Sequence, residues 1–133
     1  MIPVELSRIV FRDNADQQYI YLREIGGLRG FPIVIGSNEA MEIHRKVMNI
    51  RTPRPMTHDL VRLLLQALDA KVTRVVVNDL RDNTFFANLY LKHGDRDIVV
   101  DCRPSDAIAL ATALSVPIFV EDHVMEALAG EGE

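Results

Sequence analysis

Cysteine is almost absent from this sequence, and Cys102 is the only cysteine. A single cysteine excludes an internal disulfide and a metal site built from a cysteine cluster. Long hydrophobic runs are also absent. The longest run, residues 107–120, is interrupted by Thr112 and Pro117, and it is shorter than the roughly 20 apolar residues that a membrane-spanning helix needs. We therefore expect this run to be buried core.

The N-terminal sequence MIPVELSRIV lacks a basic segment followed by a long hydrophobic stretch. We therefore expect no secretory signal and no membrane association. Together with the single cysteine, this favours a reducing cytoplasm as the location of the protein.

An excess of positive charge is missing as well, since 15 Lys and Arg face 19 Asp and Glu, for a net charge of −4. A protein that binds nucleic acid by phosphate neutralisation alone is usually basic. The segment HRKVMNIRTPRP, residues 44–55, is locally different because it contains four basic side chains and no acid. It is either a solvated helix face and loop or a track for phosphate groups.

The chain length of 133 residues fits one domain that can bury roughly two thirds of its unfolded surface. Two-residue periodicity and turn residues predict strands, and 3.6-residue periodicity predicts helices. Strands are expected at about 4–11, 19–24, 31–36, 72–80, 84–93, 96–101 and 116–122, and helices at about 37–49, 57–70, 104–115 and 122–129. The order predicts a single α+β domain over residues 1–133, with a mixed or antiparallel sheet, a central three-stranded meander over 72–101, apolar helices packed against it, and a mobile acidic tail at about 129–133.

The helix at 37–49 is expected to begin at Ser37 or Asn38. Its apolar stripe predicts which residues lie inside and which lie outside. The inward set is Ile43, Val47 and Ile50, and the outward set is Glu42, Arg45, Lys46 and Asn49. The next helix, THDLVRLLLQALDA, has so few polar residues that we expect it to be buried around most of its circumference.

Two similar segments precede the most apolar helices. RPMTHDL occupies residues 54–60 and RPSDAIAL occupies residues 103–110. Helix formation explains part of the similarity, because proline suits the first helical position and an acid suits the positive end of a helix. On this view Arg103 is the cap residue before Pro104, and Asp106 reaches back to the N–H of that cap.

The first segment contains comparable signals, with Thr57 as a good cap residue and Asp59 in the first turn. Helix formation does not explain Arg103, because arginine is a poor cap. It also does not require Arg54 or His58. These three residues therefore point to a polar site, provided that the two helix N-termini converge.

The residues that would meet there suit phosphate chemistry. Guanidinium groups and helix N-termini bind anions, carboxylates hold a divalent metal ion such as Mg²⁺, and histidine transfers a proton. The expected catalytic residues are His58, Asp59 and Asp106. The expected phosphate- or substrate-binding residues are Arg54, Thr57, Arg103 and Ser105. The expected metal ligands are Asp59, Asp101 and Asp106.

Three stretches together, in their order and spacing, resemble the bifunctional nuclease domain family: RPMTHDL, DNTFFANLYL, and RPSDAIALA followed by PIFV. The resemblance runs from about Glu39 to Val124, and FPIVIG just before it is also similar. It implies an α+β fold that packs into homo-oligomers and an activity that degrades DNA and RNA. The polar residues that match by position are Thr57, His58, Asp59, Arg103, Ser105 and Asp106.

Two classes of function follow from these observations. The first is a metal-assisted phosphodiesterase that takes DNA and RNA as substrates. The second is a noncatalytic homo-oligomeric regulatory or ligand-binding module, in which the paired helix starts are structural caps or an interface. The acidic net charge and the capping explanation favour the second class.

Overall fold

Seven strands form one mixed sheet in the computed structural model, which describes residues 1–131. Four helices complete a single α+β domain, as the sequence predicts. The elements in chain order are β1 (Ile2–Val10), β2 (Gln17–Glu24), β3 (Gly30–Gly36), α1 (Ser37–Val47), α2 (Thr57–Ala67), β4 (Ala70–Arg81), β5 (Thr84–His93), β6 (Arg96–Cys102), α3 (Pro104–Leu114), β7 (Ile118–Val120) and α4 (Asp122–Glu131).

The strand order is β3-β2-β1-β7-β4-β5-β6, and β3 and β6 are the edges. All neighbours are antiparallel except β4 and β7, which run parallel. The predicted meander is confirmed as β4, β5 and β6. Its links contain the expected positive backbone φ values, at Asp82 and Asn83 in the first turn and at Gly94 in the second.

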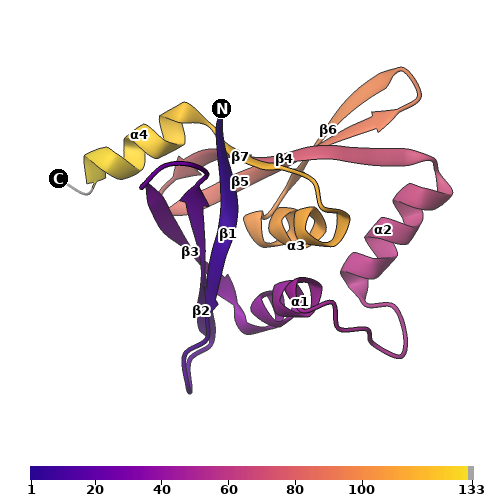
Figure 1. Cartoon of the computed structure of the whole chain (residues 1–133), viewed down its shortest axis with the longest axis horizontal. Coiled ribbons are helices and arrows are strands. Elements are labelled where there is room, and N and C mark those ends of the chain that lie inside the picture. Colours follow the sequence, from indigo (N-terminus) through magenta and orange to yellow (C-terminus); the bar gives the residue numbers. More distant parts are fainter. Residues whose placement is uncertain (132–133) are drawn as a thin grey trace.

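The sheet bends, so that its β1–β3 part and its β4–β6 part enclose helices α1 and α3 (Figure 1). Helix α3 is the most deeply buried helix, and residues from Pro104 through Ala111 are almost all buried. Its many alanines let α1 pack closely against it. The N-terminus of α3 is thereby held next to α1, and α2 lies to one side, between the connector at 48–56 and β4 (Figure 1).

Two expectations about the helices are wrong, the second of them in part. No residue of α2 is buried, and Leu60, Leu64 and Leu68 are each more than half exposed. The predicted inward face of helix α1 is only partly correct: Ile43 is buried as expected, but Glu42 is buried as well, whereas Val47 and Ile50, which lies beyond the end of the helix, are about half exposed. Glu42 is buried together with its ion-pair partners Arg45 and Lys46 of the same helix, and His58 of α2 lies beside it.

The C-terminal helix α4 continues through Glu131. We expected a mobile acidic tail at about 129–133. Residues 129–131 belong to this helix, and residues 132–133 lie outside the described residues. Within residues 1–131, no helix has the length and apolar character needed to cross a membrane.

Candidate active site at the start of α2 and α3

The two Arg-Pro segments meet through His58 and Asp106. Nε2 of His58, in the first turn of α2, lies 2.8 Å from Oδ1 of Asp106, in the first turn of α3. The His58 side chain is only 14% exposed and that of Asp106 is 26% exposed. The contact confirms that the two helix N-termini converge, which the functional interpretation of the sequence requires.

Arg103 holds the Asp106 carboxylate from the other side. Its Nε donates to Oδ2 and one terminal nitrogen donates to Oδ1, each at 2.9 Å, while the other terminal nitrogen lies 3.3 Å from Oε1 of Glu39. Burial opposes ionisation of Asp106, but the hydrogen bonds from Arg103 and His58 outweigh it and lower the pKa of this carboxyl. Asp106 is therefore a carboxylate at neutral pH.

This arrangement corrects one detail of the capping interpretation. Arg103 is the N-cap residue and Pro104 follows it, as expected, but the Arg103 side chain makes no capping hydrogen bond to the helix backbone. Asp106 binds the Arg103 guanidinium and His58, rather than the backbone N–H of the cap. Helix capping alone therefore does not explain Asp106.

The protonation of the His58 ring follows from the charge of Asp106. An ionised carboxylate can only accept, so Nε2 carries the proton and donates it to Oδ1. In the neutral ring Nδ1 is then the basic nitrogen. It faces Oε1 of Glu42 at 3.9 Å, which is too long for a hydrogen bond but close enough for an ion pair when the ring is protonated.

Glu42 is the most deeply buried acid of this region, with its side chain 6% exposed. Burial disfavours its charge, yet Arg45 and Lys46 lower its pKa, so it too is ionised. The Lys46 ammonium lies 3.2 Å from Oε1, near enough for an ion pair, but the pair is not aligned as a hydrogen bond, and Oε1 has no hydrogen-bond partner within residues 1–131. A carboxylate oxygen without a hydrogen bond from the described residues thus lies beside His58.

Lys46 also forms a hydrogen-bonded ion pair with Asp59, the neighbour of His58. This bond and a 2.9 Å hydrogen bond from the Met56 backbone N–H lower the pKa of Asp59. The second bond shows that Met56 is the N-cap of α2 and that Asp59 satisfies its N–H. The expectation that Thr57 is the cap is therefore wrong, because Thr57 is the first residue of the helix.

The result is one polar network with alternating charges, and it joins α1, α2 and α3. In order, its members are Glu39, Arg103, Asp106, His58, Glu42, Lys46 and Asp59. The sequence argument does not include Glu39, Glu42 or Lys46 among the site residues. One available signal was the position of Glu42, three and four residues before Arg45 and Lys46, a spacing at which an acid pairs with both.

Other expected site residues lie outside this network. Thr57, Arg54 and Asp101 are exposed, and the structure gives none of their side chains a hydrogen bond or ion pair within residues 1–131. Asp101 lies on β6, opposite Asn88 of β5. Ser105 is in the first turn of α3 but is buried at 6% exposure. The two motifs thus contribute His58, Asp59, Arg103 and Asp106 to the network.

The donor set does not fit a preformed magnesium site. Both oxygens of Asp106 and both oxygens of Asp59 already accept hydrogen bonds, mostly from cationic side chains. Across residues 1–131, no group of three or more His, Cys, Asp or Glu side chains is arranged to hold a metal ion. A cation could reach Asp106 only after Arg103 moves away from it.

Comparison with known proteins assigns the family. The model of the bifunctional nuclease domain matches residues 20–131, which is most of the chain. The chain belongs to the bifunctional nuclease domain family. The resemblance expected from its motifs is thereby confirmed, and the matched region contains the whole polar network.

Relatives of this bifunctional nuclease domain occur in bacteria and plants. An uncharacterized protein of Mycobacterium tuberculosis is 43% identical over 110 residues, which cover 83% of this chain and 65% of that protein. Bifunctional nuclease 1 of rice, Oryza sativa, is 30% identical over 117 residues, which cover 85% of this chain and 35% of the rice protein. The match thus spans about two thirds of the mycobacterial relative and about a third of the rice nuclease.

Cys102, the last residue of β6, is close to this site but is not suited to nucleophilic chemistry. Burial and the nearby carboxylates of Asp106 and Asp101 raise the pKa of its thiol to about 12. Only the thiolate is a strong nucleophile. In this bifunctional nuclease domain Cys102 is therefore a half-buried packing residue.

Proposed function

We propose that this chain is a nuclease that hydrolyses phosphodiester bonds in DNA and RNA, and that His58 and Asp106 are the centre of its active site. The observation that carries the proposal is the 2.8 Å contact between these residues, which come from two helix N-termini. Family membership supports it, because the rice relative is a bifunctional nuclease by name.

The chemistry assigned to the site follows from the fixed ring of His58. Asp106 holds Nε2–H, so Nδ1 is free to accept a proton from an attacking water molecule. The water oxygen bonds to phosphorus and its proton passes to Nδ1. The bond from phosphorus to the leaving oxygen breaks, and that oxygen keeps the electron pair and takes a proton from solvent. Glu42, 3.9 Å from Nδ1, stabilises the imidazolium that this step creates. Glu42 is then a further site residue.

A divalent cation such as Mg²⁺ is a separate part of the proposal, and it could bind here only after an existing ion pair opens. Arg103 has to release Asp106, or Lys46 has to release Asp59, before either carboxylate can act as a ligand. When bound, the cation would neutralise charge on the phosphate. The roles given above to His58, Asp106 and Glu42 do not depend on it.

The test is hydrolysis of single-stranded DNA and of RNA by highly purified protein and by a double variant, His58→Ala with Asp106→Asn. A matched control, His93→Ala with Asp97→Asn, changes the same residue types on the exposed β5–β6 hairpin. We expect the control to retain activity and the site variant to lose it. Equal cleavage by all three proteins would identify a contaminant and overturn the assignment.

A noncatalytic homo-oligomeric module is the second candidate, and the network itself favours it. Most charged groups of the network are already paired with one another, so the network can serve to hold three helices together. The exposed leucines of α2 also suit a protein interface. Under either function, we propose a cytoplasmic homo-oligomer in which a second copy covers α2.

A further inference from the structure

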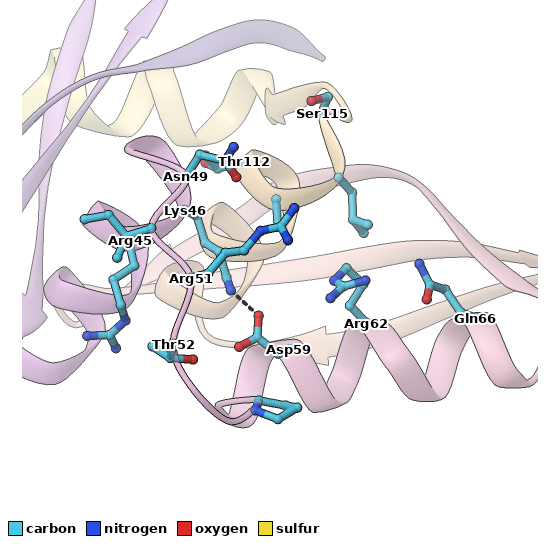
Figure 2. Close-up of a pocket in the computed structure, with 14 residues that line it drawn as sticks. Arg45, Lys46, Asn49, Arg51, Thr52, Asp59, Arg62, Gln66, Thr112 and Ser115 are labelled. Atoms are coloured by element: carbon cyan, nitrogen blue, oxygen red, sulfur yellow. Dashed lines mark hydrogen bonds and ion pairs between the residues drawn. The ribbon is translucent and has the colours of Figure 1, made fainter.

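A cleft with a volume of about 900 Å³ opens next to the polar network, and the bonded pair Lys46 and Asp59 lines it. Its walls are the end of α1, the connector at 48–56, one side of α2 and the C-terminal end of α3. Figure 2 shows the Arg51 side chain extending from the connector across the cleft, and Arg62 on α2 between Asp59 and Gln66.

The charge of this cleft is opposite to that of the whole chain. Its lining contains four basic residues, Arg45, Lys46, Arg51 and Arg62, and one acidic residue, Asp59. The chain as a whole carries a net charge of −4. Clefts lined by one sign of charge concentrate ligands of the opposite sign. The cleft therefore favours an anion.

Two of these cations form no hydrogen bond or ion pair with the described residues. Arg45 pairs with Glu42, and Lys46 pairs with Glu42 and Asp59. For Arg51 and Arg62, in contrast, the structure gives no hydrogen bond or ion pair to any side chain of residues 1–131. The charge of Asp59 attracts Arg62, but both Asp59 oxygens already accept hydrogen bonds, from Lys46 and from the Met56 N–H. Two guanidinium groups thus face one cleft without a hydrogen-bonded acid within residues 1–131.

We infer that this cleft binds the phosphate backbone of single-stranded nucleic acid, with Arg51 and Arg62 as its phosphate-binding residues. The inference deepens the nuclease proposal and rests on it for the substrate class. It moves phosphate binding away from Arg103, whose guanidinium is occupied by Asp106 and Glu39. Guanidinium groups suit phosphate because their donors match its oxygens.

The remaining lining fits the rest of a nucleotide. Asn49 and Gln66 supply amide groups. The hydroxyls of Thr52 and Thr112 already donate to backbone carbonyls and can only accept, as can the backbone carbonyls at the C-terminal end of α3. No aromatic side chain lines the cleft, so it offers no stacking platform for bases. Binding should therefore depend on backbone charge and on salt, with little sequence preference.

The position of the cleft connects it to the proposed chemistry. Lys46 contacts Asp59 at the cleft wall and Glu42 beside His58, so one side chain belongs to both regions. His58 and Asp59 are consecutive residues of α2. A strand whose phosphates lie along Arg62 and Arg51 therefore passes the start of α2, where His58 lies.

Binding is tested separately from hydrolysis, with a fluorescent 12-nucleotide single strand and His58→Ala protein, so that no cleavage occurs. Anisotropy titrations at several salt concentrations compare this protein with one that also has Arg51→Gln and Arg62→Gln. Single strands release about 0.7 counterions per neutralised phosphate. Loss of two contacts should therefore lower the slope of log K against log salt by about 1.4, and weaken binding at least tenfold at low salt.

The matched control replaces two exposed arginines outside the cleft, Arg23→Gln and Arg96→Gln, and removes the same net charge. It should bind like the parent. The variant with Arg51→Lys and Arg62→Lys keeps both positive charges, so it should keep the salt slope. It checks that substitution at these two positions does not by itself disrupt the fold. Equal binding by the parent and the Arg51→Gln, Arg62→Gln protein would overturn the inference, and so would equal affinity for a duplex or for poly-glutamate.

The outcome also separates this inference from the proposed function. If Arg51 and Arg62 prove essential for binding while wild-type protein fails to hydrolyse any strand, the cleft assignment stands and the nuclease proposal fails. If wild-type protein hydrolyses single strands and the glutamine variant binds as well as its parent, the nuclease proposal stands and the cleft assignment fails.

Discussion

Nε2 of His58 and Oδ1 of Asp106 are 2.8 Å apart although 48 positions separate the two residues in the chain. Each residue is in the first turn of its helix, and Arg103 and Glu42 lie on either side of the pair. This geometry fixes which ring nitrogen carries the proton, and it couples the roles of the two residues.

The first prediction concerns that pair. His58→Ala should lower kcat/KM for single-stranded DNA by about 10²–10⁴-fold, which is the usual contribution of a general base. Asp106→Asn should cost about as much, because an amide can present its N–H to Nε2 and leave Nδ1 protonated. The double variant should be little worse than either single one, because the two residues act as a unit. Fully additive losses would contradict the coupling.

The second prediction concerns acid stability. The folded-state pKa of Asp106 is lowered, so its ionised form stabilises the fold at pH values above the ordinary aspartate pKa of about 4. That stabilisation should be lost as pH falls through the lower folded-state pKa. Urea unfolding between pH 2.5 and 6 should show a smaller decline for Asp106→Asn than for wild type. Parallel pH profiles would show that Asp106 does not contribute.

The third prediction concerns divalent cations. Arg103→Ala removes the guanidinium that occupies Asp106 and Glu39. Millimolar Mn²⁺ should therefore raise the melting temperature of this variant more than that of wild type, as measured by calorimetry. Asp106→Asn in the same background should abolish the difference. An equal or larger shift in wild type would mean that Arg103 does not block a metal ligand.

Cys102 provides a fourth prediction. With its pKa raised to about 12, the folded protein should contain roughly a thousandth of the thiolate that an ordinary cysteine contains at pH 8.5. Alkylation by iodoacetamide should be more than tenfold slower in native protein than in 8 M urea. Rapid labelling of native protein would show that the thiol is neither shielded nor perturbed by Asp106 and Asp101.

The fifth prediction concerns the exposed side of α2. Leu64 is 53% exposed, so Leu64→Glu should change the stability of one subunit little. If a second copy covers α2, the same change should shift the protein to monomer in light scattering coupled to size exclusion. Leu28→Glu, at a residue 95% exposed in the β2–β3 turn, should leave the assembly intact. A wild-type monomer would overturn the homo-oligomer proposal.

Local signals in the sequence predict much of the fold. The meander from β4 to β6 follows from alternating apolar residues and from Asp82, Asn83 and Gly94 in its turns. The start of α3 follows from Pro104 and its small-residue continuation. These features depend on neighbours within a few residues, so the sequence alone contains the necessary information.

Glu42 illustrates what local signals miss. Its helix contains an apolar stripe on one side and charges on another, and the stripe predicts that Glu42 faces solvent. In the fold, partners distant in the chain decide its environment, because His58 of α2 and the α3 N-terminus lie against that side of α1. Leu64 shows the opposite error. The apolar sequence of its helix predicts that Leu64 is buried, but nothing in the described part of the chain packs over it.

The shallow packing of α2 has a consequence for how the site behaves over time. This helix has no buried residue and adheres through half-buried Val61 and Leu65, so its detachment costs far less free energy than unfolding of the sheet. Local opening would carry His58 away from Asp106 and leave β4 intact. Amide hydrogens of α2 should then exchange well before those of β4, and activity should fade on heating below the global melting temperature. Should a second subunit cover α2, dilution would have the same effect, and specific activity would rise with protein concentration.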